Sequence, residues 1–358
     1  MPAPSAHTRP LEELRRSDEP VFGGKSANLG ELGSAGLEVP PGFAVAASAF
    51  RAFVEETGLD GTIAAAMTRA SSGDVEEGAA AAKAIGEAMR FAPLPDAVRA
   101  EVAHRHDELV RAHGGEPPPV AVRSSAIGED SEDATFAGQQ ESFLWLRGIE
   151  QVCDALRDCW ASLYTPRAIA YRAARGTAGQ EPAMGVTVQL MVDAEVSGVL
   201  FTCNPVSGDP SVVAIDASWG LGTAVVGGEL TPDHYLVSKV TGELVRRDVH
   251  SKHAEYVPDA SGAGTVRRDV PVDRRDIACL DVVSLEALLD VARRVEQHYG
   301  AHQDLEWALA RTRPAGTVHV LQARPVTTLP ERPPTPAASA LSLMLSTFGA
   351  PSDPPGRS

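Results

Sequence analysis

Hydrophobic residues recur with helical spacing through much of the first third of the chain. The spacing predicts helices over residues 25–35 and 48–57, the first of which ends near two glycines. Residues 61–112 are rich in alanine and keep the same periodicity, although two short breaks rich in Ser, Gly and Pro interrupt them. We therefore predict three helices here, forming a helical insert over about residues 58–113.

The hydrophobic pattern changes at residue 116, where short apolar runs bounded by Gly, Pro and Asp begin. Such runs predict strands, and helical spacing returns at 151–164, 167–175 and 284–299. The predicted strands cover 119–123, 142–146, a strand-rich block at 183–249, and a closing pair at 304–310 and 318–324. This mixture predicts an α+β fold with an N-terminal lobe over residues 1–182 and a C-terminal lobe over residues 183–328.

Both ends of the chain depart from these patterns. Residues 1–18 are polar and contain Pro, which predicts a loose leader with one helical turn. Residues 329–358 are rich in Pro, Ser, Ala and Thr, which is typical of a disordered tail. Within this tail the short apolar run 341–348 is a candidate docking segment.

The amino-acid composition restricts the kinds of molecule that the protein is expected to bind. The formal charge of −16 argues against a nucleic-acid surface but leaves room for a local anion site. No apolar run approaches the roughly 20 residues of a membrane helix, and the N-terminus lacks the apolar segment of a secretory signal. The four cysteines form no C-x-x-C pair. These features predict a soluble cytoplasmic protein without a nucleic-acid or membrane partner.

The first candidate site residue is Lys25, which follows the glycine pair Gly23-Gly24 at the start of a predicted helix. Glycines allow close backbone approach, and a helix N-terminus attracts anions, so Lys25 is placed to reach a polyphosphate. A Walker A loop is excluded, because that motif needs Gly where Glu19 stands. The alternative is a plain turn with a solvated lysine.

The second candidate is Arg123, at the end of a predicted strand. A guanidinium in that position offers a rigid, forked cation at the edge of a cleft. The loop that follows, residues 126–140, contains four acidic residues and many small ones, which suits a mobile lid. The alternative is an acidic surface loop that Arg123 neutralises.

The third cluster lies on the closing strands. Residues two apart on a strand face the same way, so Asp304 pairs with Glu306 on one face, and Gln322 with Arg324. A hairpin across residues 311–316 would bring all four together. Carboxylate and amide oxygens suit Mg²⁺, which proteins often hold through one or two carboxylates plus phosphates. A surface ladder of salt bridges is the alternative.

The middle of the chain offers an apolar slot. The segment Gln189, Leu190, Met191 and Val192 could present backbone groups to a base, with Thr202 on the next strand and a glycine-rich turn at 216–222. Core packing explains these residues equally well. The closest histidine pairs, His104/His106 and His250/His253, lack metal spacing, and we expect them on the surface.

Taken in order, these motifs resemble one known family. GGKSANLGEL, AVRSSAIGED, ATFAGQQESF, CWASLYTPRAIAYR, SGVLFTCNP, DASWGLG, DLEW and QARPV together resemble the N-terminal nucleotide-binding domain of the phosphoenolpyruvate synthase and pyruvate phosphate dikinase family. Rifampicin phosphotransferase and the ATP-binding subunit of phenylphosphate synthase belong to the same group. The resemblance covers about residues 15–328.

The resemblance implies an ATP-grasp fold, in which two lobes hold Mg-ATP between them. It implies that Lys25 and Arg123 contact phosphates, that Glu306 and Gln322 hold Mg²⁺ with Asp304 nearby, and that Arg324 clamps phosphate. It also implies that Thr202 and the 189–192 segment lie near the base and phosphates. The family's reaction is transfer of pyrophosphate from ATP to a histidine on a swivelling domain, with release of AMP.

Two departures from the family pattern affect the expected function. Thr223 follows Gly222 where the family often has Glu, and no Thr-Ser-His carrier segment occurs in the 358 residues. The leading expectation is therefore a stand-alone ATP-binding module that phosphorylates a histidine on a separate partner, which would also carry the acceptor-binding domain. The alternatives are direct phosphorylation of a small molecule and a non-catalytic nucleotide-binding regulator.

Overall fold

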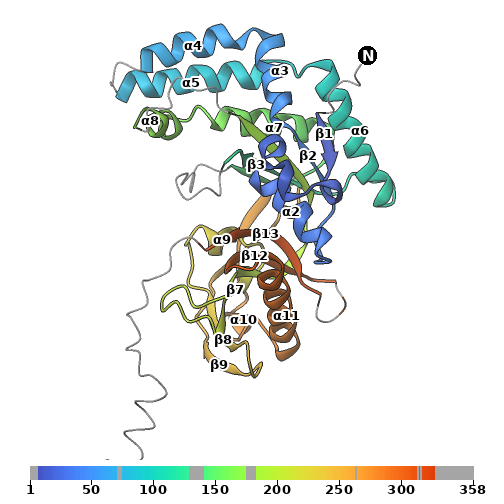
Figure 1. The fold of residues 1–358 in the computed structure, drawn as a ribbon, viewed down its shortest axis with the longest axis vertical. Coiled ribbons are helices and arrows are strands. Elements are labelled where there is room, and N and C mark those ends of the chain that lie inside the picture. The colour runs from blue at the N-terminus through green and yellow to red at the C-terminus, as the bar shows by residue number, and fades with distance from the viewer. Residues whose placement is uncertain are drawn as a thin grey trace, which may run out of the picture.

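The computed structural model describes residues 7–70, 75–128, 141–174, 183–262, 264–312, 314 and 317–326. They form two large β-sheets and a two-stranded one, with helices packed around them, so the predicted α+β class is confirmed (Figure 1). Residues 129–140 of the lid predicted at 126–140, and the predicted tail with its docking segment at 341–348, lie outside the described residues.

The first sheet is antiparallel and has the strand order β1-β2-β5-β3-β4. Its strands are β1 (Thr8–Pro10), β2 (Gly42–Val45), β5 (Met184–Leu190), β3 (Val120–Ala126) and β4 (Ser142–Leu146). Val122 and Val188 from its central strands are fully buried in the larger apolar core. The sheet thus presents one face to a helical layer.

That helical layer contains the predicted insert. It comprises α3 (Ala47–Thr57), α4 (Leu59–Ala70), α5 (Val75–Phe91), α6 (Asp96–Ala112), α7 (Gly148–Ser162) and α8 (Pro166–Ala174). Phe53, Ile85 and Trp160 fill the space between these helices and the sheet. The prediction of three helices within residues 61–112 is confirmed by α4, α5 and α6.

The second sheet has the antiparallel order β13-β12-β6-β7-β8-β9. Its strands are β6 (Ala194–Phe201), β7 (Val212–Trp219), β8 (Asp233–Ser238), β9 (Leu244–Asp248), β12 (Gln303–Ala310) and β13 (His319–Pro325). The helix α11 (Val282–Tyr299) covers one face, where Leu288 and Val295 pack with Leu305 and Trp307. The opposite face is left for the site described below.

Three smaller elements complete the second unit. They are α9 (Thr223–Val226), α10 (Val272–Arg275) and the hairpin of β10 (Ala254–Pro258) and β11 (Thr265–Asp269). The sequence pattern did not predict this hairpin, because the strand-rich block was placed at 183–249. β11 is exposed along most of its length and consists mainly of polar residues, so it gives no clear hydrophobic pattern.

Two boundary predictions need correction. β5 lies between β2 and β3, so the chain leaves the first sheet after Leu190 rather than at residue 183. The leader predicted for residues 1–18 is also structured where it is described. β1 pairs with β2, and the short turns η1 (Leu11–Glu13), η2 (Arg16–Asp18) and α1 (Glu19–Phe22) follow, with Leu11, Leu14 and Phe22 buried.

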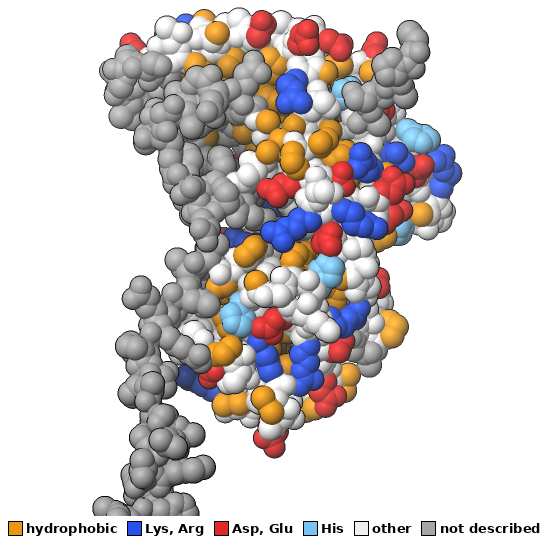
Figure 2. Space-filling model, in the orientation of Figure 1, with side chains coloured by type: hydrophobic (Ala, Val, Ile, Leu, Met, Phe, Trp, Pro, Cys, Tyr) orange, Lys and Arg blue, Asp and Glu red, His pale blue; other side chains and the backbone are white. Residues whose placement is uncertain are grey.

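The helix α2 (Gly24–Ser34) connects the two units. Leu29 packs with the buried residues beneath the first sheet, whereas Leu32 belongs to the core of the second sheet. The N–H of Val320 in β13 donates to the carbonyl of Glu38 at 2.8 Å. In the space-filling view, Lys, Arg and acidic side chains lie along the waist where the two units meet (Figure 2).

One histidine departs from expectation. His106 is buried on the same face of α6 as Val102, four residues earlier, so the expected surface position is wrong for this residue. Burial lowers the pKa of His106.

Within the described residues, no helix combines the length and the apolar character needed to cross a bilayer.

Candidate functional site

A pocket of about 420 Å³ lies between the two sheets. The first sheet contributes residues of β3, β4 and β5, and the second contributes residues of β6, β12 and β13. The remaining wall comes from Glu141 and from the segments 191–192 and 221–227. A volume of this size is typical of pockets for small organic ligands.

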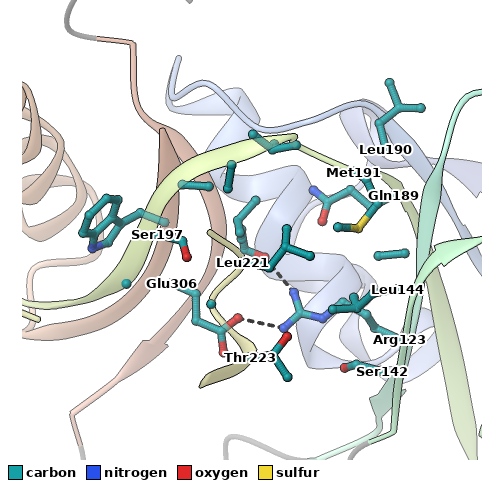
Figure 3. A pocket seen from close by; sticks show the side chains of 18 of the residues that line it. Arg123, Ser142, Leu144, Gln189, Leu190, Met191, Ser197, Leu221, Thr223 and Glu306 are labelled. Atoms are coloured by element: carbon teal, nitrogen blue, oxygen red, sulfur yellow. Dashed lines mark hydrogen bonds and ion pairs between the residues drawn. The ribbon is translucent and has the colours of Figure 1, made fainter. Parts of the chain in front are cut away.

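Arg123 connects the two sheets at one end of this pocket. Its Nη2 donates to Glu306 Oε2 at 2.8 Å (Figure 3). The same nitrogen donates to Gln322 Oε1 at 3.0 Å, and Nη1 donates to the carbonyl of Leu321 at 3.1 Å. The Arg123 side chain is only 12% exposed, so the ion pair is poorly screened by water. The predicted meeting of Arg123 with the closing hairpin is confirmed.

The carboxylate of Glu306 is held in its charged form. Burial on its own would raise the pKa of Glu306, but Arg123, with Lys25 and Arg324 further away, brings that pKa below its ordinary value. Glu306 is therefore an anion surrounded by cations, and it faces the pocket.

The closing strands pair as the sequence predicted. In the β12–β13 ladder Glu306 stands opposite Gln322, and Asp304 stands opposite Arg324. Arg324 Nε donates to Asp304 Oδ2 at 2.8 Å. Burial raises the pKa of Asp304, although Arg324 acts in the opposite direction. The hairpin thus brings two carboxylates, an amide and a guanidinium to one place.

Lys25, on α2, lies near Glu306 but does not itself line the pocket. Its Nζ donates to the carbonyl of Ser124 at 2.9 Å, and the residue is only 4% exposed. The close approach depends on Gly23, whose φ is +81°. A Cβ on Gly23 would lie 2.0 Å from the carbonyl oxygen of Ser125. The solvated-lysine alternative is therefore wrong, because the ammonium group is enclosed between α2 and β3.

The predicted apolar slot forms another part of the pocket. Gln189, Leu190, Met191 and Val192 all line it. The N–H groups of Leu190 and Met191 donate to the carbonyls of Pro41 and Pro119, and the side-chain amide of Gln189 donates to Pro40. Because these donors are already bonded within the protein, a ligand at this wall would contact the apolar side chains and the remaining backbone groups of the segment.

The glycine-rich turn after β7 lines the pocket only at its far end. Leu221, Gly222 and Thr223 face the cavity, and Thr223 begins α9. Asp216, at the start of the predicted turn, instead pairs with His234 Nδ1 at 2.7 Å within the second sheet.

Thr202 is not among the residues that line the pocket. It is fully buried at the end of β6, and its hydroxyl accepts the N–H of Gln303 at 2.9 Å. Lys25, Asp304, Gln322 and Arg324 do not line the pocket either, but they lie beside Arg123 and Glu306, whereas Thr202 lies in the core of the second unit.

Sequence reasoning missed several pocket residues. Ser142 and Leu144 on β4, and Ser197 and Gly198 on β6, all line the cavity. Strand alternation could have grouped Ser142 with Leu144. No local signal pointed to the β6 pair, since only the pairing of β6 with β12 places it at the site.

Charged side chains of both signs gather at this end. The three cations are Lys25, Arg123 and Arg324, and they are balanced by the carboxylates of Asp304, Glu306 and Glu141, the last of which also lines the pocket. Among the described residues, no group of three or more His, Cys, Asp or Glu side chains could hold a metal ion alone. Two carboxylates and an amide oxygen would suit a cation that also takes oxygens from an anionic ligand. The pocket thus combines a charged end with an apolar one.

The amino-acid sequence is similar to those of several known proteins. Residues 19–343 match the family model described as "Pyruvate phosphate dikinase, AMP/ATP-binding domain". A probable phosphoenolpyruvate synthase of Methanothermobacter thermautotrophicus is 38% identical over 340 residues, which are 95% of this chain and 49% of that protein. The phosphoenolpyruvate synthase of Pyrococcus furiosus is 36% identical over 90% of this chain and 44% of its own length. The phosphoenolpyruvate synthase of Aeropyrum pernix is 37% identical over 88% of this chain and 42% of its own length. The chain spans at most about half the length of these relatives.

Proposed function

The chain belongs to the family of the pyruvate phosphate dikinase AMP/ATP-binding domain, and from this premise we propose that it binds Mg-ATP between its two sheets and donates a phosphoryl or pyrophosphoryl group. The relatives carry the name phosphoenolpyruvate synthase, which makes an ATP-dependent phosphotransferase the activity class to test. In this proposal the arrangement of the two sheets is an ATP-grasp fold.

One observation carries the proposal. Arg123 from the first sheet contacts Glu306 and Gln322 of the second sheet at the edge of a pocket of about 420 Å³. A nucleotide has the matching shape, because its base is flat and largely apolar and its phosphates are anionic. The segment 189–192 would face the base, and Lys25, Arg123 and Arg324 would face the phosphates.

The residues of the hairpin fit a magnesium ion. Glu306 Oε2 and Gln322 Oε1 already converge on a single cationic nitrogen, Arg123 Nη2. Two oxygens that share one cationic partner are suited to share a divalent cation, with Asp304 close by. Magnesium, when bound, would neutralise phosphate charge and polarise the phosphorus–oxygen bonds.

The chain's own residues would position the phosphates and stabilise charge. In a pyrophosphoryl transfer, an acceptor nitrogen bonds to the β-phosphorus while the bond from that phosphorus to the α-bridging oxygen breaks, and AMP leaves. Negative charge then accumulates on the bridging oxygen. The three cations supply the preorganised electrostatic stabilisation that phosphoryl transfer requires.

We propose that the acceptor is a histidine on a separate partner with a swivelling domain. No Thr-Ser-His segment occurs in the 358 residues, and the relatives are about twice as long as the aligned region or longer. The partner would also bind the final acceptor of the phosphoryl group.

The test uses the purified chain and ATP labelled at the β-phosphate. Calorimetry should detect Mg-ATP binding. Addition of a partner that carries a candidate histidine should release AMP and place acid-labile label on that histidine. Arg123→Ala should abolish the labelling while the protein stays folded.

Each other outcome changes the assignment. Label that stays in released ADP would favour direct transfer of the γ-phosphate to a small molecule, which ATP labelled at the γ-phosphate would then label. Mg-ATP binding without turnover, with every histidine-carrying partner tried, would favour a non-catalytic nucleotide-binding regulator. The variant Thr223→Glu would then test whether the absence of a carboxylate at this position explains the lack of turnover. Absence of Mg-ATP binding would overturn the whole proposal.

A further inference from the structure

Trp145 has an unusual backbone conformation close to the pocket. Its φ is +60°, and it is the only residue other than glycine with a positive φ in the described parts of the chain. A bulky side chain is disfavoured there, because the Cβ crowds the backbone. Such strained residues persist only where the surrounding contacts enforce them, and they concentrate at functional sites.

The strain arises from a bulge in β4. Val122 pairs with Phe143 and Val120 pairs with Leu146, so Leu144 and Trp145 together stand opposite a single residue of β3. Phe143 and Leu146 pack against the helical core of the first unit. Trp145 shares an apolar cluster with residues of the second unit instead. The bulge thus redirects the ring, as bulges next to binding sites often do.

The cluster that receives Trp145 is the apolar wall of the pocket. Its other fully buried members are Ala194, Leu221 and Ala308, which all line the cavity. Met191 and Val192 pack on the same cluster and also line the cavity. Trp145 does not line it and is 6% exposed, so its ring lies behind the wall.

A backbone contact adds to this packing. The carbonyl of Trp145 accepts the N–H of Gly264, at the turn of the β10–β11 hairpin, at 3.0 Å. The same hairpin contacts the pocket turn, because the carbonyl of Tyr256 accepts the N–H of Leu221 at 2.9 Å. β4, the hairpin and the pocket wall are therefore held together at Trp145.

We propose that Trp145 is a positioning residue that sets nucleotide affinity by bracing the apolar wall of the pocket across the two units. This inference rests on the proposed function, since the ligand is taken to be Mg-ATP. The ring does not touch the ligand. It holds Leu221 and its neighbours where a base would stack, so its loss should weaken binding more than it slows any chemical step.

The test compares Trp145→Ala and Trp145→Phe with the matched control Trp160→Phe. Trp160 is fully buried in the helical core, against Phe50 and Phe53. Calorimetry should show that Trp145→Ala weakens Mg-ATP binding roughly tenfold, about 1.4 kcal/mol, and that Trp145→Phe restores most of the affinity. Trp160→Phe should lose stability without losing affinity. In the presence of a partner, the KM for ATP should rise in Trp145→Ala with little change in kcat.

A second measurement needs no nucleotide. Hydrogen exchange of the free protein should quicken in peptides covering residues 254–262 for Trp145→Ala but not for Trp160→Phe, because the hairpin loses its support. Unchanged hydrogen exchange in these peptides would show that the Trp145 side chain does not brace the hairpin. This result can be obtained whether or not the wild-type chain binds ATP. Wild-type binding combined with equal affinity in a folded Trp145→Ala variant would overturn the role in the pocket. Failure of the wild type to bind Mg-ATP would instead reject the proposed function.

Discussion

At the scale of single residues, the geometry of Arg123 explains why arginine stands at this position. Its Nη2 donates hydrogen bonds to the side-chain oxygens of Glu306 and Gln322, and its Nη1 donates to the carbonyl of Leu321. A planar guanidinium can make these contacts at once, whereas an ammonium group is a single point of charge. The residue therefore joins the two sheets as well as offering charge to a ligand.

Arg123→Lys should accordingly behave as a severe change. We expect Mg-ATP affinity to fall roughly thirtyfold, about 2 kcal/mol, because Glu306 and Gln322 lose part of their shared partner. Calorimetry measures the affinity. Arg246→Lys is the control, since Arg246 pairs with Asp248 on the exposed strand β9 with its side chain 62% exposed. Equal affinities in both variants would show that the fork of Arg123 is not needed.

The polar residues of the site were predictable because their chemistry is visible in the sequence. Glycines beside Lys25 and alternating oxygens on a hairpin each suggest anion or cation binding on their own. Arg123 was expected at the end of a strand, but β3 continues to Ala126, so this residue lies in the middle of its strand. Trp145 was not predictable, because its orientation depends on a bulge that strand alternation cannot reveal. Thr202 was assigned by resemblance, and the structure leaves it outside the pocket.

At the scale of elements, the start of α2 depends on close packing. Gly23 brings the helix against β3, and this contact places Lys25 beside Ser124. The approach is possible only without a side chain, because a Cβ at φ +81° would overlap the backbone of Ser125.

Gly23→Ala should therefore lower the free energy of unfolding by about 2 kcal/mol or more and weaken Mg-ATP binding. Urea denaturation and calorimetry measure the two effects. Gly33→Ala, in the same helix with no atom within 4 Å of the added Cβ, should be neutral or stabilise the protein by up to about 1 kcal/mol. A Gly23→Ala variant as stable as Gly33→Ala would contradict this account.

The helices and most strands followed from local pattern, but sheet membership did not. The strand at 184–190 was expected in the C-terminal lobe, since it adjoins other strands in sequence. Its partners, β2 and β3, lie more than 50 residues earlier, and no local signal identifies such distant pairing. The hairpin β10–β11 was missed because its strand β11 is exposed and polar.

At the scale of the whole molecule, a ligand that contacts both sheets should stabilise them together. At a concentration of Mg-ATP 100 times its Kd, the free energy of unfolding should rise by about 2.7 kcal/mol. Hydrogen exchange should slow on β3 and β12 alike, and a chelator should remove most of both effects if the oxygens of Glu306 and Gln322 hold Mg²⁺. Protection of one sheet alone, or full stabilisation by ATP in the presence of chelator, would contradict binding in this interface.

The position of β5 also determines how the gene can be divided. An expression fragment ending at residue 182 would separate the β1–β2 pair from the β3–β4 pair, because β5 is the only strand between them in the described sheet. A fragment beginning there would carry a strand with two unpaired, apolar edges, which favours aggregation. A cut after Leu190 would keep that sheet whole, but α2 would then expose the leucine that it buries against the second core. Soluble halves therefore require a break after Leu190 together with polar replacements of Leu32 and of Leu37, which is buried in the same core.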